Sequence, residues 1–426
     1  MSAAILFIAL LGLILIGVPI TYCIGLSSAI YLVVAGGKPL IIVAQRTLIG
    51  MDSFVLLAVP LFTLSGYLME KGGLSHRLVD WVEKLFGRFT GATGTITIVC
   101  CAIFAALTGS GPATVAAIGA VMMTPLLKSG YSRSTAAGML AAGGALGPII
   151  PPSVAMIVYG STMSVSIPKM FMGSIIPGIM ITLLYIAVNY VIAKKHGIKG
   201  ENVQYTFKEI ALSTYKALGV LLLPIIVLGG IYGGLFTPTE AATVCVVYSI
   251  ILGFGYRELT FKSLVEAFQR TVVTSASIAL IIGISAVFGW ILTAAKIPAN
   301  IAHTLVPLFG NASVYLLVLM LLLFVVGCLM ECLSAIVILA PIVVPIGLEL
   351  GVDPLHLGVV FCINLVVGFI TPPFGVNLFT AVSTTNTPYV QVVRGSLPFM
   401  LVAIVAVVIL TFVPQIILFL PSLAAQ

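Results

Sequence analysis

The sequence predicts an all-α polytopic membrane protein made of two inverted repeats, each with five spans and one re-entrant hairpin. Composition and an internal repeat carry this prediction. Of the 426 residues, 61% are hydrophobic and only 7% are charged, and the mean hydropathy is +1.26. A soluble fold of this composition would expose more apolar surface than its core could bury, so lipid must be the solvent.

Several spans are evident from composition alone. The first twenty residues lack a basic region and an Ala-x-Ala cleavage site, so we expect a retained first helix. Thr271–Ala295 and Ser396–Gln426 contain no charged residue, and about 20 such residues cross a hydrocarbon layer of about 30 Å. The seven cysteines lie in apolar segments without the spacing of a zinc site.

The repeat is visible when the two halves are aligned. Leu74–Gly87 matches Ile297–Gly310, both ending in Leu-Phe-Gly, and 21 residues after these glycines stand Thr108 and Glu331. The first segment places apolar and charged side chains on opposite faces. We expect interfacial helices over residues 73–88 and 296–310, each followed by a hairpin.

The first hairpin is predicted over residues 89–128. Phe89–Leu127 carries no charge and would be roughly 58 Å long as one helix, about twice the bilayer thickness. Basic residues flank it on both sides, which favours a hairpin that enters and leaves at the cytoplasmic face over two full crossings. These flanking residues are Lys84, Arg88, Lys128 and Arg133. The matching hairpin is predicted over residues 313–350.

Each hairpin is followed by a helix that contains a Gly/Pro cluster. Pro151 in Gly147–Val154 follows Thr108 by 43 residues, and Pro372 in Gly368–Asn377 follows Glu331 by 41. Such clusters release backbone hydrogen bonds that lipid cannot satisfy, so they persist only beside protein or a water-filled cavity. We predict broken helices over residues 134–165 and 355–386, and paired breaks of this kind indicate a binding site.

The predicted domain organisation is a first repeat over residues 1–193, a cytoplasmic linker over 194–213 and a second repeat over 214–426. With both termini in the periplasm, 15 of the 19 Lys and Arg residues fall on the cytoplasmic side, as the positive-inside bias requires. The basic residues form no continuous face, so the net charge of +7 does not indicate a nucleic-acid partner.

The breaks and tips predict two sodium sites. A helix broken in mid-membrane presents free carbonyl groups on one half and positive N-terminal ends on the other, and these suit Na⁺ and carboxylates respectively. The first predicted site comprises Thr108, Gly109, Ser110, Gly147, Ile150 and Pro151. The second comprises Gly327, Cys328, Glu331, Gly368, Thr371 and Pro372.

Uncharged polar residues between the tips are candidates for substrate recognition. The predicted substrate-binding residues are Thr114, Pro152, Ser153, Ser334, Pro373 and Asn377. Taken singly, each of them is more typical of a helix-packing contact. Glu331 has two interpretations: a cation or proton site, because carboxylates at membrane depth are costly, or a carboxylate satisfied by neighbouring hairpin N–H groups.

An intramembrane enzyme and a channel are the competing classes. The chain has only three aspartates, no His-Glu-x-x-His motif and no phosphate-binding loop. These absences argue against an aspartyl protease, a zinc protease and direct use of ATP. A channel would not need two inverted hairpins with broken helices.

Three motifs resemble the large membrane (M) subunit of tripartite ATP-independent periplasmic (TRAP) transporters over essentially the whole chain. They are Thr108–Thr114, Gly147–Ser153 and Gly-Leu-Phe-Thr-Pro-Thr-Glu-Ala-Ala at Gly234–Ala242. The resemblance implies a bacterial inner-membrane symporter of the elevator type, coupled to two or more Na⁺ ions. It implies two partners, a small four-helix membrane subunit and a periplasmic substrate-binding protein, and an organic-acid substrate, with sialic acid favoured over a C4-dicarboxylate. A self-sufficient Na⁺-coupled dicarboxylate carrier is the alternative.

Overall fold

The computed structural model describes residues 2–36, 38–86, 89–200 and 205–424, and every extended regular element in these ranges is a helix. Nine helices of this described part are long and apolar enough to cross a membrane. The chain is therefore an all-α, multi-pass membrane protein, as the composition predicts. Arg88 and part of the predicted linker, residues 201–204, lie outside the described ranges.

The first half contains the helices from α1 to α10. Their bounds are α1 (Ser2–Leu15), α2 (Ile20–Tyr31), α3 (Ile41–Met51), α4 (Ala58–Lys71), α5 (Leu74–Phe86), α6 (Ala92–Thr108), α7 (Gly111–Lys128), α8 (Arg133–Ala145), α9 (Val154–Met163) and α10 (Ile167–Lys195). A π-helical turn, Leu32–Gly36, extends α2, and a 3-10 turn, Phe54–Leu57, precedes α4.

The second half contains the helices from α11 to α20. Their bounds are α11 (Phe207–Tyr232), α12 (Pro238–Gly255), α13 (Phe261–Ala294), α14 (Ile297–Phe309), α15 (Ala312–Leu329), α16 (Cys332–Glu349), α17 (Pro354–Gly368), α18 (Val376–Thr385), α19 (Tyr389–Phe412) and α20 (Gln415–Leu423).

Two residues connect the arms of each hairpin. Gly109 has a left-handed backbone with φ of +61° and Ser110 is extended, so α6 turns directly into α7. In the second hairpin Met330 and Glu331 are both extended between α15 and α16. Such tight connections keep the arms antiparallel and in contact.

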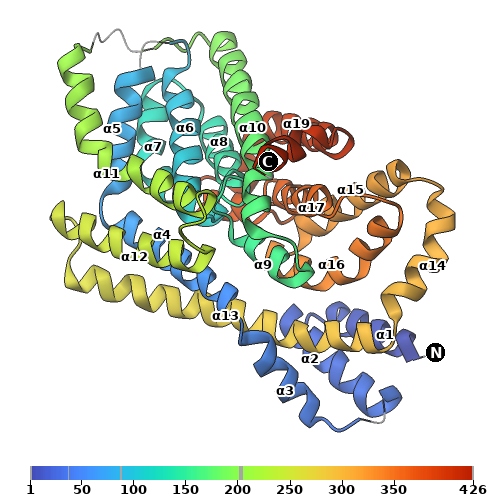
Figure 1. The fold of residues 1–426 in the computed structure, drawn as a ribbon. Helices are drawn as coiled ribbons and strands as arrows, with labels where there is room; N and C mark the ends of the chain where they lie inside the picture. The colour runs from blue at the N-terminus through green and yellow to red at the C-terminus, as the bar shows by residue number, and fades with distance from the viewer. Residues whose placement is uncertain (1, 37, 87–88, 201–204, 425–426) are drawn as a thin grey trace.

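The contacts between helices recur in the two halves. In the first hairpin the second arm, α7, packs on α18. In the second hairpin the equivalent arm, α16, packs on α9. In the same way α8 packs on α19 while α17 packs on α10. Each repeat therefore completes the other, and the hairpins and broken helices form one interlocked unit (Figure 1).

A second group of helices packs around α13. This 34-residue helix contacts α2, α3 and α4, while α12 packs along α4. Figure 1 shows α13 crossing the lower part of the molecule, with α2 and α3 below its C-terminal half and α1 beside them. Hydrogen bonds join this group across its helices, from Ser65 to Ser249 at 3.1 Å and from Tyr67 to Thr274 at 3.3 Å.

The amphipathic helix α5 lies against α11. Leu74, Leu78 and Val82 are buried, and Trp81 donates a hydrogen bond from Nε1 to Oγ1 of Thr214 at 3.1 Å. Leu85 of the same helix is 40% exposed, where lipid can cover it.

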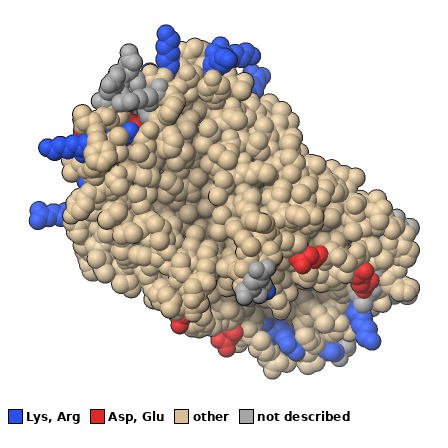
Figure 2. All heavy atoms as spheres, turned by 45° about the horizontal axis from the view of Figure 1, so that its top comes forward, with Lys and Arg blue, Asp and Glu red and all other residues tan. Residues whose placement is uncertain are grey.

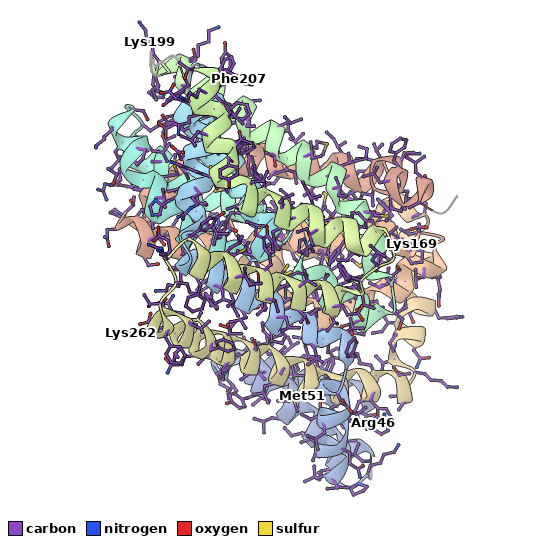
Figure 3. The ribbon with its side chains drawn as sticks, turned by 60° about the vertical axis from the view of Figure 1, so that its left-hand side comes forward. Arg46, Met51, Lys169, Lys199, Phe207 and Lys262 are labelled. Carbon is purple, nitrogen blue, oxygen red and sulfur yellow. The ribbon has the colours of Figure 1, made fainter. Side chains whose placement is uncertain are left out.

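Charged side chains lie at the periphery. Figure 2 shows Lys and Arg around the edge of one face, with a broad uncharged surface between them. In Figure 3, Lys199 and Lys262 lie on one side of the molecule, and Lys169 and Arg46 lie on the opposite side. The uncharged zone between the two sides is the surface that lipid can cover.

Candidate functional site

A cavity of about 640 Å³ separates the two groups of helices. Helices α4 and α13 form one wall. The opposite wall contains both hairpin tips and residues from both breaks, so segments far apart in sequence meet at one place. Of the predicted site residues, four line this cavity: Thr108, Gly109, Ser110 and Glu331.

The first tip lies directly on the first break. A Cβ atom on Gly147 would stand 2.6 Å from the carbonyl carbon and oxygen of Ser110, and one on Gly109 would stand 2.6 Å from the oxygen of Pro152. Only glycine permits this approach of two backbones. The hydroxyl of Thr114 donates to the oxygen of Ser110 at 2.8 Å and lies 3.2 Å from the hydroxyl of Thr108.

The second hairpin also contacts the break of its own repeat, but through the last turn of α15, just before the tip. A Cβ atom on Gly368 would collide with the backbone of Gly327. The N–H of Gly375 donates to the oxygen of Cys328 at 3.3 Å, and the hydroxyl of Thr371 donates to the oxygen of Val367 at 2.9 Å. Gly327, Cys328 and Glu331 line a second cavity of about 450 Å³ beside the tip.

Both breaks also share their backbone form. The peptide bonds Pro151–Pro152 and Pro372–Pro373 are cis. Ile150 is half-buried and packs against Gly178 of α10. Pro151 and Pro372 lie within the irregular segments that separate α8 from α9 and α17 from α18.

Glu331 is the N-cap of α16. Its Oε2 accepts hydrogen bonds from the N–H groups of Leu333 at 2.9 Å and Ser334 at 3.1 Å. This geometry is the second of the two sequence interpretations, a carboxylate satisfied by hairpin N–H groups. The side chain is nevertheless exposed and lines both cavities, so it also faces any ligand there.

The six predicted substrate-binding residues do not line the larger cavity. Ser153 caps α9 by accepting from the N–H of Met156 at 3.3 Å, and it donates to the oxygen of Pro148 at 2.5 Å. Ser334 and Thr114 are buried within the hairpins. Pro152 is also buried, and Pro373 accepts a hydrogen bond from the hydroxyl of Tyr389 at 2.6 Å.

Asn377 connects the two repeats. It is fully buried at the start of α18, yet its Nδ2 donates to the oxygen of Ala141 in α8 at 3.2 Å. Its amide also fills the space beside Gly111 and Gly144, where an added Cβ would meet it. Within the described residues its Oδ1 has no hydrogen-bond partner.

Four helices begin at the wall of the larger cavity. Its lining includes the first residues of α7, α9, α16 and α18. Free N–H groups and helix dipoles favour negative charge at such ends. The carboxylate of Glu331 occupies this role at α16, whereas the cap of α7, Ser110, makes no side-chain hydrogen bond to its helix.

The sequence prediction includes no residue of the other wall, which contains charged and aromatic side chains. Glu70 and Tyr67 come from α4, and Arg270 comes from α13. A sequence signal does exist for the last of these, because Arg270, Thr274, Ser277 and Ile281 recur every three or four residues and share a face of the helix.

The fold and cavity define a membrane transporter of the kind with paired re-entrant hairpins. Two solved transporters share this fold: YdaH from Alcanivorax borkumensis, with a TM-score of 0.66, 15% identity and coverage of 96% of this chain and 97% of that one, and MtrF from Neisseria gonorrhoeae, with a TM-score of 0.59, 16% identity and coverage of 89% and 85%. At these identities the likeness concerns the fold alone.

Sequence comparison identifies the family. Residues 7–416 match the model described as "Tripartite ATP-independent periplasmic transporter, DctM component". The chain therefore belongs to the large permease subunits of TRAP transporters, as its motifs predict. Members of this family are transporter permeases, not enzymes.

Named relatives differ in what their names say they carry. An isethionate TRAP permease, DctMQ of Oleidesulfovibrio alaskensis, is 40% identical over 95% of this chain, which spans 64% of that protein's length. A C4-dicarboxylate large permease of Pseudomonas aeruginosa is 36% identical, with 94% and 93% covered. A sialic acid large permease of Vibrio cholerae is 33% identical, with 97% of both chains covered.

Proposed function

We propose that this chain takes up an organic acid across the bacterial inner membrane by Na⁺ symport, as the large permease of a TRAP transporter. One observation carries the proposal: both hairpin tips and both broken helices meet at a single cavity, and each hairpin lies on the break of its own repeat. Paired breaks at a repeat interface are typical of substrate and ion sites in secondary transporters.

The contacts between tip and break support two Na⁺ sites. The backbones of Ser110 and Gly147 are in direct contact, as are those of Gly327 and Gly368. Ser110 and Gly147 lie beyond helix ends, whereas Gly327 and Gly368 lie in the last turns of α15 and α17. Backbone carbonyl groups without a partner in their own helix occur at both kinds of position, and they can replace water around a hard cation. We therefore retain the two predicted sodium sites, for two or more transported ions.

An elevator motion follows from the division into two groups of helices. The predicted repeats, 1–193 and 214–426 with the linker 194–213 between them, each contribute one hairpin and one broken helix to the moving unit. Helices α1 to α4 and α11 to α13 supply the static scaffold. The unit borders the scaffold closely at Gly66, where an added Cβ would stand 3.2 Å from the Thr108 methyl group.

Family membership supports the two predicted partners, a small four-helix membrane subunit and a periplasmic binding protein that delivers the substrate. In this proposal both termini are periplasmic, as the distribution of Lys and Arg predicts. Lipid surrounds the scaffold. The alternative is a dicarboxylate carrier that works alone. The two structural neighbours share the fold and do not decide between these alternatives.

The substrate is an organic acid whose negative group suits the helix N-termini at the cavity. The relatives' names include isethionate, C4-dicarboxylates, sialic acid and 2,3-diketo-L-gulonate. Sialic acid remains our first candidate, from overall resemblance alone. The names of the relatives with higher identity mention isethionate and C4-dicarboxylates instead. All four acids therefore belong in the first assay.

The test is uptake of these radiolabelled acids into proteoliposomes under an inward Na⁺ gradient. The chain is assayed alone and then with its small subunit and binding protein. Uptake of one acid that needs Na⁺ and all three components supports the proposal. Uptake by the chain alone would support the self-sufficient carrier, and uptake indifferent to Na⁺ would contradict the coupling.

A further inference from the structure

Helix α13 presents a regular stripe of residues to the larger cavity. Arg270, Thr274, Ser277 and Ile281 all line it, and the stripe extends along the helix for roughly 16 Å at 1.5 Å per residue. Ile281 lies well within the apolar part of the helix, whereas Arg270 is close to its charged N-terminal end. The cavity therefore reaches from the middle of the protein toward one membrane surface.

Helix α4 runs antiparallel to α13 along the same wall. Gly66 borders the first hairpin tip, and Tyr67 is hydrogen-bonded to Thr274 at 3.3 Å. Glu70 lies one turn further along α4, which brings it to the level of Arg270. The hairpin tips thus border the inner end of the cavity, and Arg270 and Glu70 border its mouth.

The mouth opens toward the side that the charges assign to the cytoplasm. Lys71 pairs with Glu266 at 3.5 Å just beyond it, and Arg77 pairs with Glu258 at 3.6 Å. Lys262 lies at the same end of α13, on the side of the molecule that also carries Lys199 (Figure 3). Positive charge marks the cytoplasmic ends of membrane helices.

Arg270 differs from these neighbouring cations. Its side chain is exposed to the cavity, and among the described residues it makes no ion pair within 4 Å and no hydrogen bond. The wall that the structure describes contains no other Lys or Arg. A guanidinium group carries five N–H donors in a planar fork that matches a carboxylate or sulfonate.

We propose that Arg270 is the release-side anion site of the transporter. Resting on the proposed uptake of an organic acid, this inference assigns Arg270 a step that the hairpins cannot perform. It belongs to α13 in the scaffold, so it stays at the cytoplasmic mouth while the hairpins move. Arg270 binds the carboxylate or sulfonate group after it leaves the helix N-termini, and the substrate then passes from the cavity into the cytoplasm.

The first experiment measures anion attraction without any substrate. A fluorophore is attached to Ser277→Cys of the full chain, which is feasible because all seven native cysteines are buried. Quenching by iodide is then compared with quenching by neutral acrylamide. The comparison is made with Arg270, with Arg270→Gln, with Arg270→Lys and with the control Lys262→Gln, which removes the same charge from an exposed position of the same helix outside the cavity.

We expect Arg270→Gln to lower the iodide quenching constant roughly 3- to 5-fold at low salt, because Arg270 is the only cation of the described cavity wall and its loss leaves Glu70 and Glu331 to repel the anion. The effect shrinks at high salt. Acrylamide quenching stays unchanged, Arg270→Lys keeps most of the iodide effect, and Lys262→Gln has none. Equal iodide quenching with and without Arg270, or an equal loss in Lys262→Gln, overturns the inference, since Arg270 would then face bulk water or lipid headgroups.

The second experiment places the site in the transport cycle. In the reconstituted tripartite system, with isethionate, malate or N-acetylneuraminate as probe, Arg270→Gln should lower the maximal rate roughly 5- to 20-fold and leave the external KM and the Na⁺ dependence unchanged. A raised external KM at unchanged maximal rate would place Arg270 at loading and overturn the proposal. Absence of uptake by the unaltered protein would instead contradict the proposed function, while the iodide result would still decide whether Arg270 attracts anions.

Discussion

The two hairpin tips share a backbone arrangement and differ in chemistry. At the first tip, Gly109 and Ser110 connect the arms, and the cap of α7 makes no side-chain hydrogen bond to its helix. At the second tip, the carboxylate of Glu331 caps α16 through two N–H groups. Both tips border the same cavity.

The two repeats share the backbone contacts of their tips and differ in the charge that each tip places at the cavity. Close backbone contacts between hairpin and break occur in both halves, as a pair of similar ion sites would require. The charge at the cavity does not repeat, so the half that carries Glu331 imposes a preference on the ligand that the neutral half does not. Four predictions test the two parts of this comparison.

The largest effect should come from the backbone contacts that the halves share. Gly147→Ala and Gly368→Ala each place a methyl group on the backbone of a hairpin, at Ser110 and Gly327 respectively. Overpacking of this kind costs about 1 to 3 kcal/mol, and the displaced carbonyl groups should lower Na⁺-driven uptake by about 100-fold or more. Uptake assays and thermal unfolding measure both effects.

Gly289→Ala is the matched control, because an added Cβ there has no neighbour within 4 Å. It should leave uptake unchanged. If Gly147→Ala impairs uptake and Gly368→Ala does not, the two halves do not share a backbone-based ion site.

The next effect concerns the charge that the halves do not share. Glu331→Ala removes a helix cap, which costs about 1 kcal/mol, and changes the charge of the cavity wall. We expect uptake to fall by roughly 10-fold, since a carboxylate at membrane depth that faces the cavity suits a coupling cation.

Asp353→Ala is its control. Asp353 caps α17 in the same way, with Oδ1 accepting from the N–H groups of Leu355 at 2.8 Å and His356 at 3.0 Å, but it does not line the cavity. The Asp353→Ala variant should lose a similar amount of stability and retain normal uptake. Equal losses of uptake in both variants would reduce Glu331 to a helix cap.

A smaller effect should follow from single hydroxyl groups at the two predicted ion sites. Ser110→Ala and Thr371→Ala should each raise the Na⁺ concentration for half-maximal uptake by roughly 3- to 10-fold, the loss expected for one hydrogen-bond-sized contact. Thr182→Ala, which removes a similar helix-backbone bond in α10, is the control. Unchanged Na⁺ activation in both site variants would place the ions elsewhere.

The smallest effect on activity should come from a test of the inversion itself. His76 on α5 and His303 on α14 are exposed, so His76→Cys and His303→Cys should retain uptake. A membrane-impermeant thiol reagent should label the first only from the cytoplasm and the second only from the periplasm. Labelling of both from one side would contradict the inverted arrangement.

The breaks could be predicted from sequence because their causes are local. Gly and Pro clusters inside apolar segments interrupt hydrogen bonding wherever they occur, so the ends of α8 and α17 are visible in the sequence. The hairpins follow from length and flanking charge. Thr108, Ser110 and Glu331, at the predicted tips, line the cavity.

The orientation of side chains within these segments could not be predicted. Which face of a broken helix meets the cavity depends on how the two repeats interlock, and this is set by contacts such as those of α7 with α18. Ser153 and Asn377 therefore point into the protein, where one caps a helix and the other bridges the repeats. Arg270 lies on α13, outside the tips and breaks from which the site residues are predicted.

The bridge formed by Asn377 has a thermodynamic consequence. Its amide belongs to the second broken helix but is held by the first repeat, at Ala141 and beside Gly111 and Gly144. Any event that shifts one of these segments changes the free energy of the other, and such linkage is reciprocal. Occupancy of one half then changes the affinity of the other by the same factor in either order. A single shared amide thus couples two similar halves thermodynamically.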